Sequence, residues 1–424
     1  MKLLLFALLT FILSLTIIFS LAISFSANTI ENPELSHENL IKLKNKLSAN
    51  NPFKTQRTEL KRISLDEKMV NEGVRLVLSN YSHFPISIKL NDGYAQVTTS
   101  PALSVLSINL YVNIRFNASV KNNMITFTKI NIGALPIPSF IYNLTYPYIK
   151  HTLRKNYPEY DRLFSNIHQI SLVEEKISIV YQWDRRFSQH AQQVGKNLLI
   201  TKNEQNLIAI YYRQLSKNPH ILFRKKASLH KIIQPLFSFT KTRVGKGNDP
   251  VNENRAAILT LGIFASGIRI NHLIKLKKNQ HFRHLHYGRI TLSGRGDLMR
   301  HFLISAALTV TTNKTLAEAI GLSKELNDAN EGSGFSFADL LADKAGVAFA
   351  NMATNVDTAN LFLTRIAAQS LSSSSFMPPH GDLPESITGL EFKRIYIDIN
   401  TKKYQYIEDE ISRRVNQLPL LSRI

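Results

Sequence analysis

Residues 294–346 read GRGDLMRHFLISAALTVTTNKTLAEAIGLSKELNDANEGSGFSFADLLADKAG, and this stretch decides the organisation of the chain. Acids, one histidine and a few bases recur in it at helical spacing inside an apolar, Ala-rich background. The pattern predicts three helices, over about residues 297–312, 315–329 and 336–355, with a tight Gly-Ser-Gly link before the third. We therefore expect a helical domain in which the polar side chains of the three helices return close together.

The candidate functional residues of this stretch are His301, Glu325, Asp328 and Asp343. Carboxylates three or four residues apart on facing helices are the arrangement with which helical bundles build metal sites. A histidine among carboxylates suits Mg, Mn, Zn or Fe, so one hypothesis is that these four residues bind a divalent metal. A second is that His301 and one carboxylate act as acid and base. A third is a structural charge network, and all three stay open at this point.

Several neighbouring acids have a local explanation. Asp297 follows Gly-Arg-Gly and fits the N-cap of the first helix, and Ser336-x-x-Asp339 reads as a capping box for the third. Lys324 and Asp328 form an i,i+4 pair. What local structure leaves unexplained is the histidine facing the remaining carboxylates.

The order of these residues resembles the core of the YfiM-type lipoproteins. The resemblance is carried by Asp297-x-x-x-His301-x-x-x-Ser305-Ala306, Lys324-Glu325-x-x-Asp328, Gly334-Phe335-Ser336 and Asp339-Leu340-x-x-Asp343-x-x-Gly346. The larger C-terminal part is similar to a family of uncharacterised proteobacterial envelope proteins. This resemblance implies an envelope location and a small helical domain, and it implies no particular reaction. The chain departs from the lipoprotein members because it has no cysteine to carry a lipid.

The N-terminus predicts a membrane helix. Residues 3–27 read LLLFALLTFILSLTIIFSLAISFSA, and no charged residue lies between Lys2 and Glu31. This stretch is long enough to cross a bilayer, whereas a cleaved signal peptide has a shorter apolar core. Small residues near its end leave cleavage open, and we favour an uncleaved signal anchor over residues 1–30. The positive-inside rule then predicts a single-pass inner-membrane protein with its body in the periplasm.

Composition narrows the class of partner. The chain of 424 residues has a formal net charge of +21, which attracts polyanions such as anionic lipid or wall polymers. Export counts against nucleic acid, and no nucleic-acid partner is expected. The absence of cysteine excludes disulfides, thiolate metal sites and a cysteine nucleophile.

The remaining chain predicts an α+β fold. A polar spacer is expected over residues 31–63, followed by a curved antiparallel sheet domain with flanking helices over residues 64–185. In that domain a capping box at Ser64 predicts a helix start, and strict alternation over residues 106–116 predicts one long strand. The concave face of the sheet could hold a lipid tail or be covered by the two helices.

A helical connector is expected over residues 186–248, and Asp249-Pro250 opens an all-α C-terminal domain over residues 249–424. Together these features predict a non-catalytic envelope protein, anchored in the membrane, that binds or organises lipid or wall material. The alternative is a metal-dependent hydrolase acting on an envelope lipid or polymer, with the histidine and three carboxylates above as ligands or as acid and base.

Overall fold

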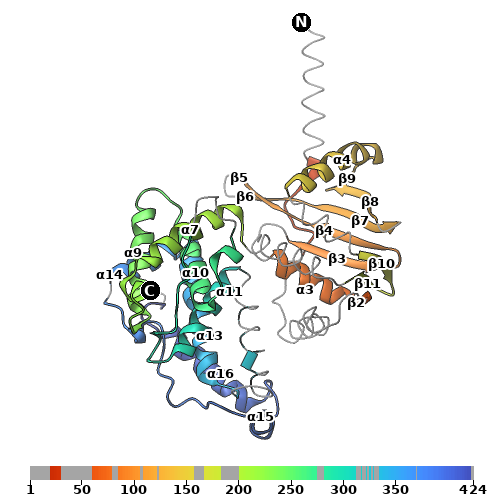
Figure 1. The fold of residues 1–424 in the computed structure, drawn as a ribbon. Coiled ribbons are helices and arrows are strands. Elements are labelled where there is room, and N and C mark those ends of the chain that lie inside the picture. Colours follow the sequence, from red (N-terminus) through yellow and green to blue (C-terminus); the bar gives the residue numbers. More distant parts are fainter. Residues whose placement is uncertain are drawn as a thin grey trace. The chain divides into compact units, whose positions relative to one another are not determined.

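The chain folds into two compact units, a sheet-containing unit over Met1–Leu198 and a helical unit over Leu199–Ile424 (Figure 1). The computed structural model describes residues 20–29, 60–78, 85–105, 108–121, 124–156, 167–182, 200–274, 281–311, 317, 321, 324–325, 328, 334–368 and 370–421. The α+β class predicted from the sequence is confirmed.

The main sheet of the first unit has five antiparallel strands in the order β3-β4-β7-β8-β9. Their bounds are β3 Ile86–Asn91, β4 Tyr94–Thr99, β7 Ile114–Lys121, β8 Met124–Ile132 and β9 Leu135–Pro136. Gly93 has a φ of +79° in the turn that joins β3 to β4, as expected where the chain reverses at Asp92-Gly93. The helix α4, Ser139–Asn156, follows β9 directly.

A second sheet corrects the predicted start of this unit. It consists of β10 (Ile167–Val173), β11 (Lys176–Gln182) and β2 (Leu60–Asp66), in that order. Ser64 therefore lies in a strand opposite Ser178, and the predicted helix start at Ser64 is wrong. The helix α3 begins at Glu67 and ends at Leu78, and Asp66 caps it by accepting a 2.8 Å hydrogen bond from the backbone N–H of Met69. The spacer predicted to residue 63 thus ends in strand structure, and its part before Leu60 lies outside the described residues.

The long strand predicted over residues 106–116 is also wrong, because the chain changes sheets at Asn113. Before this residue β6 (Ile108–Val112) pairs with β5 (Ala102–Val105) and with β1 (Ile23–Ser24), whereas β7 after it belongs to the main sheet. The buried Asn113 side chain accepts hydrogen bonds from the backbone N–H of Asn28 at 2.9 Å and from the Ser100 hydroxyl at 2.7 Å. These bonds fix the break between the two strands.

Most of the predicted membrane anchor lies outside the described residues. Within the described ranges, no helix has both the length and the apolar character needed to cross a bilayer. The last part of the predicted span is not helical, because Ile23 and Ser24 form β1 and pair with Val112 and Tyr111.

The helical unit is built around α10, α11 and α13. The bounds of its described helices are α7 Lys202–Ser216, α8 Pro219–Leu222, α9 His230–Val244, α10 Pro250–Ser266, α11 Gly296–Thr311, α13 Phe337–Thr354, α14 Ala359–Ala368, α15 Gly389–Tyr396 and α16 Lys402–Asn416. As predicted, Asp249 caps α10 and Pro250 is its first residue. The unit also contains one short parallel ladder, in which β12 (Ala227–Ser228) pairs with β13 (Ile290–Thr291).

Part of the predicted connector belongs to the core of this unit. Ile208 of α7 and Phe237 of α9 are fully buried, and they belong to the same apolar cluster as Ala257 of α10. A buried ion pair reinforces this packing, since Arg243 of α9 binds Glu253 of α10 through two hydrogen bonds of 2.7 Å. Residues 186–199 of the predicted connector lie outside the described residues.

Candidate functional site

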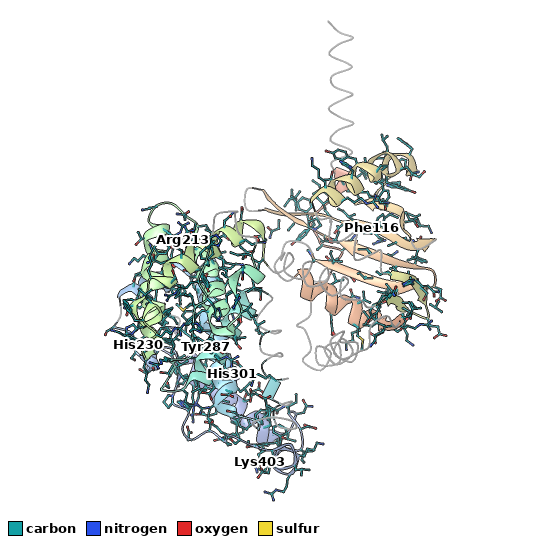
Figure 2. The ribbon with its side chains drawn as sticks, in the orientation of Figure 1. Phe116, Arg213, His230, Tyr287, His301 and Lys403 are labelled. Atoms are coloured by element: carbon teal, nitrogen blue, oxygen red, sulfur yellow. The ribbon has the colours of Figure 1, made fainter. Side chains whose placement is uncertain are left out.

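The candidate site lies where α11 meets α13, and a third segment contributes Glu325 to it. His301 comes from α11, and Asp339 and Asp343 come from the first half of α13 (Figure 2 marks His301). The two helices approach so closely that a Cβ atom on Gly346 would clash with the carbonyl oxygen of Phe302. A glycine at this position therefore lets the backbones meet and brings the polar side chains of both helices together.

His301 lies between two carboxylates of α13. Its Nδ1 atom is 3.1 Å from Oδ1 of Asp343, and its Nε2 atom is 3.3 Å from Oδ2 of Asp339. Only 10% of the His301 side chain is exposed. Burial by itself lowers the pKa of His301, but the hydrogen bonds and charges of the two aspartates outweigh it and raise the pKa to about 10. Without an added cation, His301 is therefore an imidazolium held between two carboxylates.

Glu325 approaches the same histidine from the third segment. Its Oε1 atom is 4.0 Å from Nε2 of His301, and its side chain is fully buried. Lys324 donates to Oε1 at 3.0 Å, and the backbone N–H of Ser336 donates to Oε2 at 3.1 Å. Burial raises the pKa of the Glu325 carboxyl to about 7, although the positive charge of Lys324 opposes this shift.

Asp343 is the most constrained carboxylate of the site. Its Oδ1 atom accepts a 2.6 Å hydrogen bond from the Ser305 hydroxyl in addition to the contact with His301. Its Oδ2 atom is buried and has no hydrogen-bond partner within the described part of the chain. That oxygen lies against Gly321, where a Cβ atom would come within 2.6 Å of it. A buried carboxylate oxygen without a donor is costly, so its environment favours a partner such as a water or a cation.

The structure brings three of the four predicted residues together and places the fourth at the edge. His301, Glu325 and Asp343 each offer one ligand atom, and these atoms lie within 4.8 Å of one another. The carboxylate of Asp328 instead accepts a 2.6 Å hydrogen bond from Lys324, and 29% of its side chain is exposed. The i,i+4 pair with Lys324 predicted from the sequence is confirmed by this contact.

Asp339 is a residue of the cluster that sequence reasoning assigned to a helix cap. The Ser336 hydroxyl does cap α13 by accepting from the backbone N–H of Asp339 at 3.1 Å. The carboxylate of Asp339 points elsewhere, toward His301, and its Oδ1 atom lies 3.6 Å from Arg295. Arg295 also contacts both oxygens of Glu385, at 2.7 and 2.8 Å, so it links the rim of the cluster to the loop before α15.

The donor set fits a divalent cation. One imidazole nitrogen and two carboxylate oxygens are a ligand combination used by Zn, Mn and Fe, whereas Mg prefers oxygen alone. A cation bound to Asp343 would also compensate the buried charge of this carboxylate, one oxygen of which has no donor in the described part of the chain. Binding would require His301 to lose the proton that the two aspartates hold on it.

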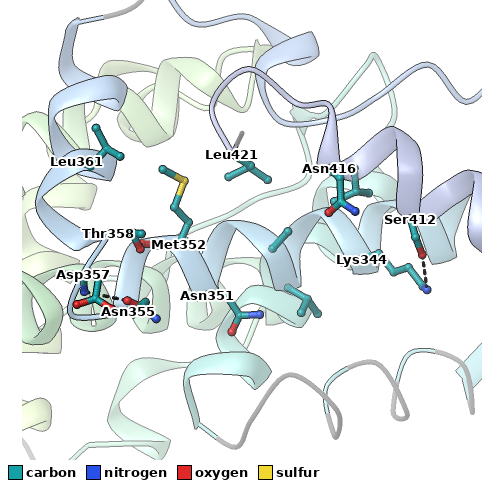
Figure 3. Close-up of a pocket in the computed structure, with 13 residues that line it drawn as sticks. Lys344, Asn351, Met352, Asn355, Asp357, Thr358, Leu361, Ser412, Asn416 and Leu421 are labelled. Carbon is teal, nitrogen blue, oxygen red and sulfur yellow. Dashed lines mark hydrogen bonds between the residues drawn. The ribbon is translucent and has the colours of Figure 1, made fainter. Parts of the chain in front are cut away.

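A pocket of about 700 Å³ lies on another side of α13 (Figure 3). Its wall combines amide and hydroxyl groups with an apolar floor, including Asn351, Asn355, Asn416, Met352 and Leu421. Lys344 at one end donates to Glu408 at 3.0 Å and to Ser412 at 3.1 Å, so its charge is already paired with α16. The neighbours Asp343 and Lys344 thus lie on different faces of α13, one toward His301 and the other toward α16.

Comparison of the chain with protein-family models, curated proteins and solved structures finds no match. The resemblance to YfiM-type lipoproteins therefore stays a prediction. The candidate site consists of a largely buried histidine enclosed by three carboxylates from two segments.

Proposed function

We propose that this chain is a membrane-tethered, non-catalytic envelope protein whose helical unit binds a divalent cation through His301, Glu325 and Asp343. The observation that carries this proposal is the convergence of three ligand atoms within 4.8 Å of one another around a buried aspartate with an unpaired oxygen. The cation joins α11, α13 and the segment of Glu325 at one point.

A bound cation would pair with buried carboxylates and stabilise the fold. Buried charges are stable only when they are paired, and removing one partner of a buried pair costs about 3–5 kcal/mol. A cation at this point neutralises Glu325 and Asp343 directly, and it leaves Asp339 to Arg295, 3.6 Å away. Because its ligands come from separate segments, it stabilises the folded helical unit relative to the unfolded chain.

Enclosure of the site favours a structural role over catalysis. A catalytic metal keeps one position open for water or substrate. Here Glu325 is fully buried, the Asp343 side chain is 4% exposed and that of His301 is 10% exposed. A lipid or polymer has little access to such a centre, which is why we place the hydrolase second.

The membrane and wall part of the proposal rests on sequence properties. Residues 3–27 are uncharged and mostly apolar, and the formal net charge of +21 favours contact with anionic lipid or wall polymers. The protein would thus hold its helical unit close to the periplasmic face of the inner membrane, where it binds or organises such material.

Metal content of the purified full-length protein tests the proposal. Bound metal is first removed from the protein with a chelator. After dialysis against Zn²⁺ or Mn²⁺, the metal content is measured by inductively coupled plasma mass spectrometry, and binding to the metal-free protein is measured by isothermal titration calorimetry. We expect one ion per chain, lost in Asp343→Asn and retained in Asp328→Asn, whose carboxylate lies on Lys324 rather than on His301. Circular dichroism checks that both variants remain folded.

Two results would contradict this proposal. If the wild-type protein binds no ion, or if Asp343→Asn binds as much ion as the wild type, the cluster is a charge network and not a metal site. Metal-dependent release of product from envelope lipid or wall polymer, abolished in Asp343→Asn, would support the hydrolase instead.

A further inference from the structure

Helix α4 carries a stripe of large apolar side chains that face solvent. Phe140, Leu144 and Tyr148 are 68%, 79% and 75% exposed. Their spacing of four residues places them on one side of the helix. Single exposed apolar residues are common on protein surfaces, but an aligned series of this size marks an interaction surface.

Another side of α4 faces the sheet. Tyr146 packs edge-on against Phe127 of β8, with ring centroids 6.1 Å apart. Tyr142 and Lys150, four residues to either side of Tyr146, are only partly exposed. The stripe of Phe140, Leu144 and Tyr148 is therefore presented outward by a helix whose other side contacts its own sheet.

The apolar N-terminal sequence leads to the same part of the unit. The backbone N–H of Ala134, in the turn between β8 and β9, donates to the carbonyl oxygen of Leu21 at 2.8 Å. Leu21 and Phe25 are themselves 40% and 80% exposed. Because Ala134 comes directly before β9, and β9 leads into α4 at Ser139, the described end of the predicted tether contacts the chain close to the start of α4 (Figure 1).

The charge of α4 fits an anionic surface. Its sequence, SFIYNLTYPYIKHTLRKN, contains no acid, and Lys150, His151 and Lys155 lie in its second half. Aromatic side chains together with lysines are typical of helices that lie in the plane of the membrane interface.

We propose that α4 docks on the surface of an anionic bilayer, with Phe140, Leu144 and Tyr148 among the headgroups and upper acyl chains. This inference rests on the membrane tether of the proposed function, and it adds a second point of contact that orients the sheet unit against the bilayer. One tether allows the unit to rotate, whereas a tether plus an interfacial helix fixes the face that it turns to the lipid.

The chain has no cysteine, so single spin labels report on chosen positions. Full-length Leu144→Cys and Lys89→Cys are labelled with a nitroxide and reconstituted into vesicles of phosphatidylcholine with phosphatidylglycerol. Lys89 is the control because it is exposed on β3, at the opposite edge of the sheet from β9 and α4. We expect collisions with oxygen, relative to a water-soluble nickel complex, to be several-fold more frequent at position 144 than at position 89.

A charge test accompanies the depth measurement. Replacing Lys150 and Lys155 by Glu should lower the ratio at position 144 toward that at position 89 in the same vesicles. An unchanged collision ratio in this variant would contradict the proposal that α4 binds an anionic bilayer surface.

Failure of the tether and failure of the docking surface give different results. Protein that does not float with the vesicles contradicts the tether, and the docking proposal with it. Protein that floats while both labels stay equally exposed to nickel contradicts the docking surface alone. Shielding of position 144 in lipid-free protein held in an amphiphilic polymer would show that a second copy of the chain covers the stripe, and would also overturn the proposal.

Discussion

Raising the pH of the metal-free protein from 7.5 to 9.5 should destabilise its helical unit. In that form His301 holds a proton between Asp343 and Asp339, at 3.1 and 3.3 Å, with the Glu325 carboxylate 4.0 Å away. Its pKa is raised to about 10 in the folded protein, whereas the ordinary value is 6.5. A group with a raised folded pKa contributes its full stability below the unfolded value, and this stability is lost as the pH rises through the folded value.

The size of the effect follows from these two values. Between them the unfolded chain has released the proton that the folded chain still holds, so the free energy of unfolding falls by about 1.36 kcal/mol per pH unit. Integrated from pH 7.5 to 9.5, the loss attributable to His301 is roughly 2–3 kcal/mol. Glu325, whose pKa is about 7, has titrated largely before this window begins.

The assay has to report on the helical unit alone, because the chain has two units and need not unfold in one step. A fluorophore on Asn360→Cys, an exposed position on α14 in a chain without other cysteines, provides that signal. Urea unfolding is followed with chelator present at both pH values. The matched control is His301→Gln in the same labelled background, which has no proton to lose.

Parallel loss of stability in wild type and His301→Gln would refute the reasoning, because the proton would then not be held by this histidine. With saturating Zn²⁺ the wild-type dependence on pH should shrink or reverse, since a coordinated imidazole is already deprotonated and protons compete with the ion. Retention of the full pH dependence in saturating Zn²⁺ would show that the ion does not bind at His301.

Two further substitutions test the packing that holds the site. Gly346→Ala should lower the free energy of unfolding of the helical unit by about 1–3 kcal/mol, because the added methyl group meets the Phe302 carbonyl. The control is Gly381→Ala, which has open space around it and should change the free energy of unfolding by less than about 0.5 kcal/mol in the same urea assay. Asn254→Ala should cost about 1–3 kcal/mol, because it removes the buried amide that donates to the Ala353 carbonyl at 2.7 Å. Thermal unfolding of the variant checks this, and an unchanged midpoint would contradict it.

Two helix starts of the C-terminal unit, at Asp249 and Ser336, could be predicted because their signals are local; the predicted N-cap at Asp297 is wrong, because Asp297 lies inside the first turn of α11 and accepts from Arg295. Asp249 accepts from the backbone N–H of Asn252 and Ser336 accepts from that of Asp339, and both contacts depend only on residues three positions away. The same locality explains why the candidate site was predicted only in part. The Ser336-x-x-Asp339 pattern accounts for a backbone N–H, but the carboxylate of Asp339 is directed by His301, which lies on another helix.

Spacing alone also could not separate Glu325 from Asp328. Both fit the same turn of a predicted helix, but Glu325 is fully buried and receives the Ser336 N–H, while Asp328 stays at the surface with Lys324. Which of two carboxylates turns inward depends on the neighbouring segment, and a single sequence does not contain that information in a local pattern.

The sheet unit shows a different limit. Alternation over residues 106–116 reports which side chains share a face, and it is silent on which strand lies alongside. One of the two strands that pair with β6 is β1, which lies far away in the sequence. The break at Asn113 likewise depends on a remote backbone group, the N–H of Asn28. A strand that changes sheets therefore looks like one long strand until its partners are known.

The close approach of α11 and α13 at Gly346 has a consequence for ion selectivity. Because the Phe302 carbonyl leaves no room for even a methyl group there, the spacing of the two helices is set by their main chains and not by adaptable side chains. Calcium takes six to eight oxygen ligands at about 2.3–2.6 Å, whereas zinc is satisfied by four ligands at about 2.0–2.2 Å. Main-chain contact at Gly346 keeps α11 and α13 at a short separation, and the three ligand atoms between them include one nitrogen, so the site offers too few oxygens for calcium and suits a small transition metal better.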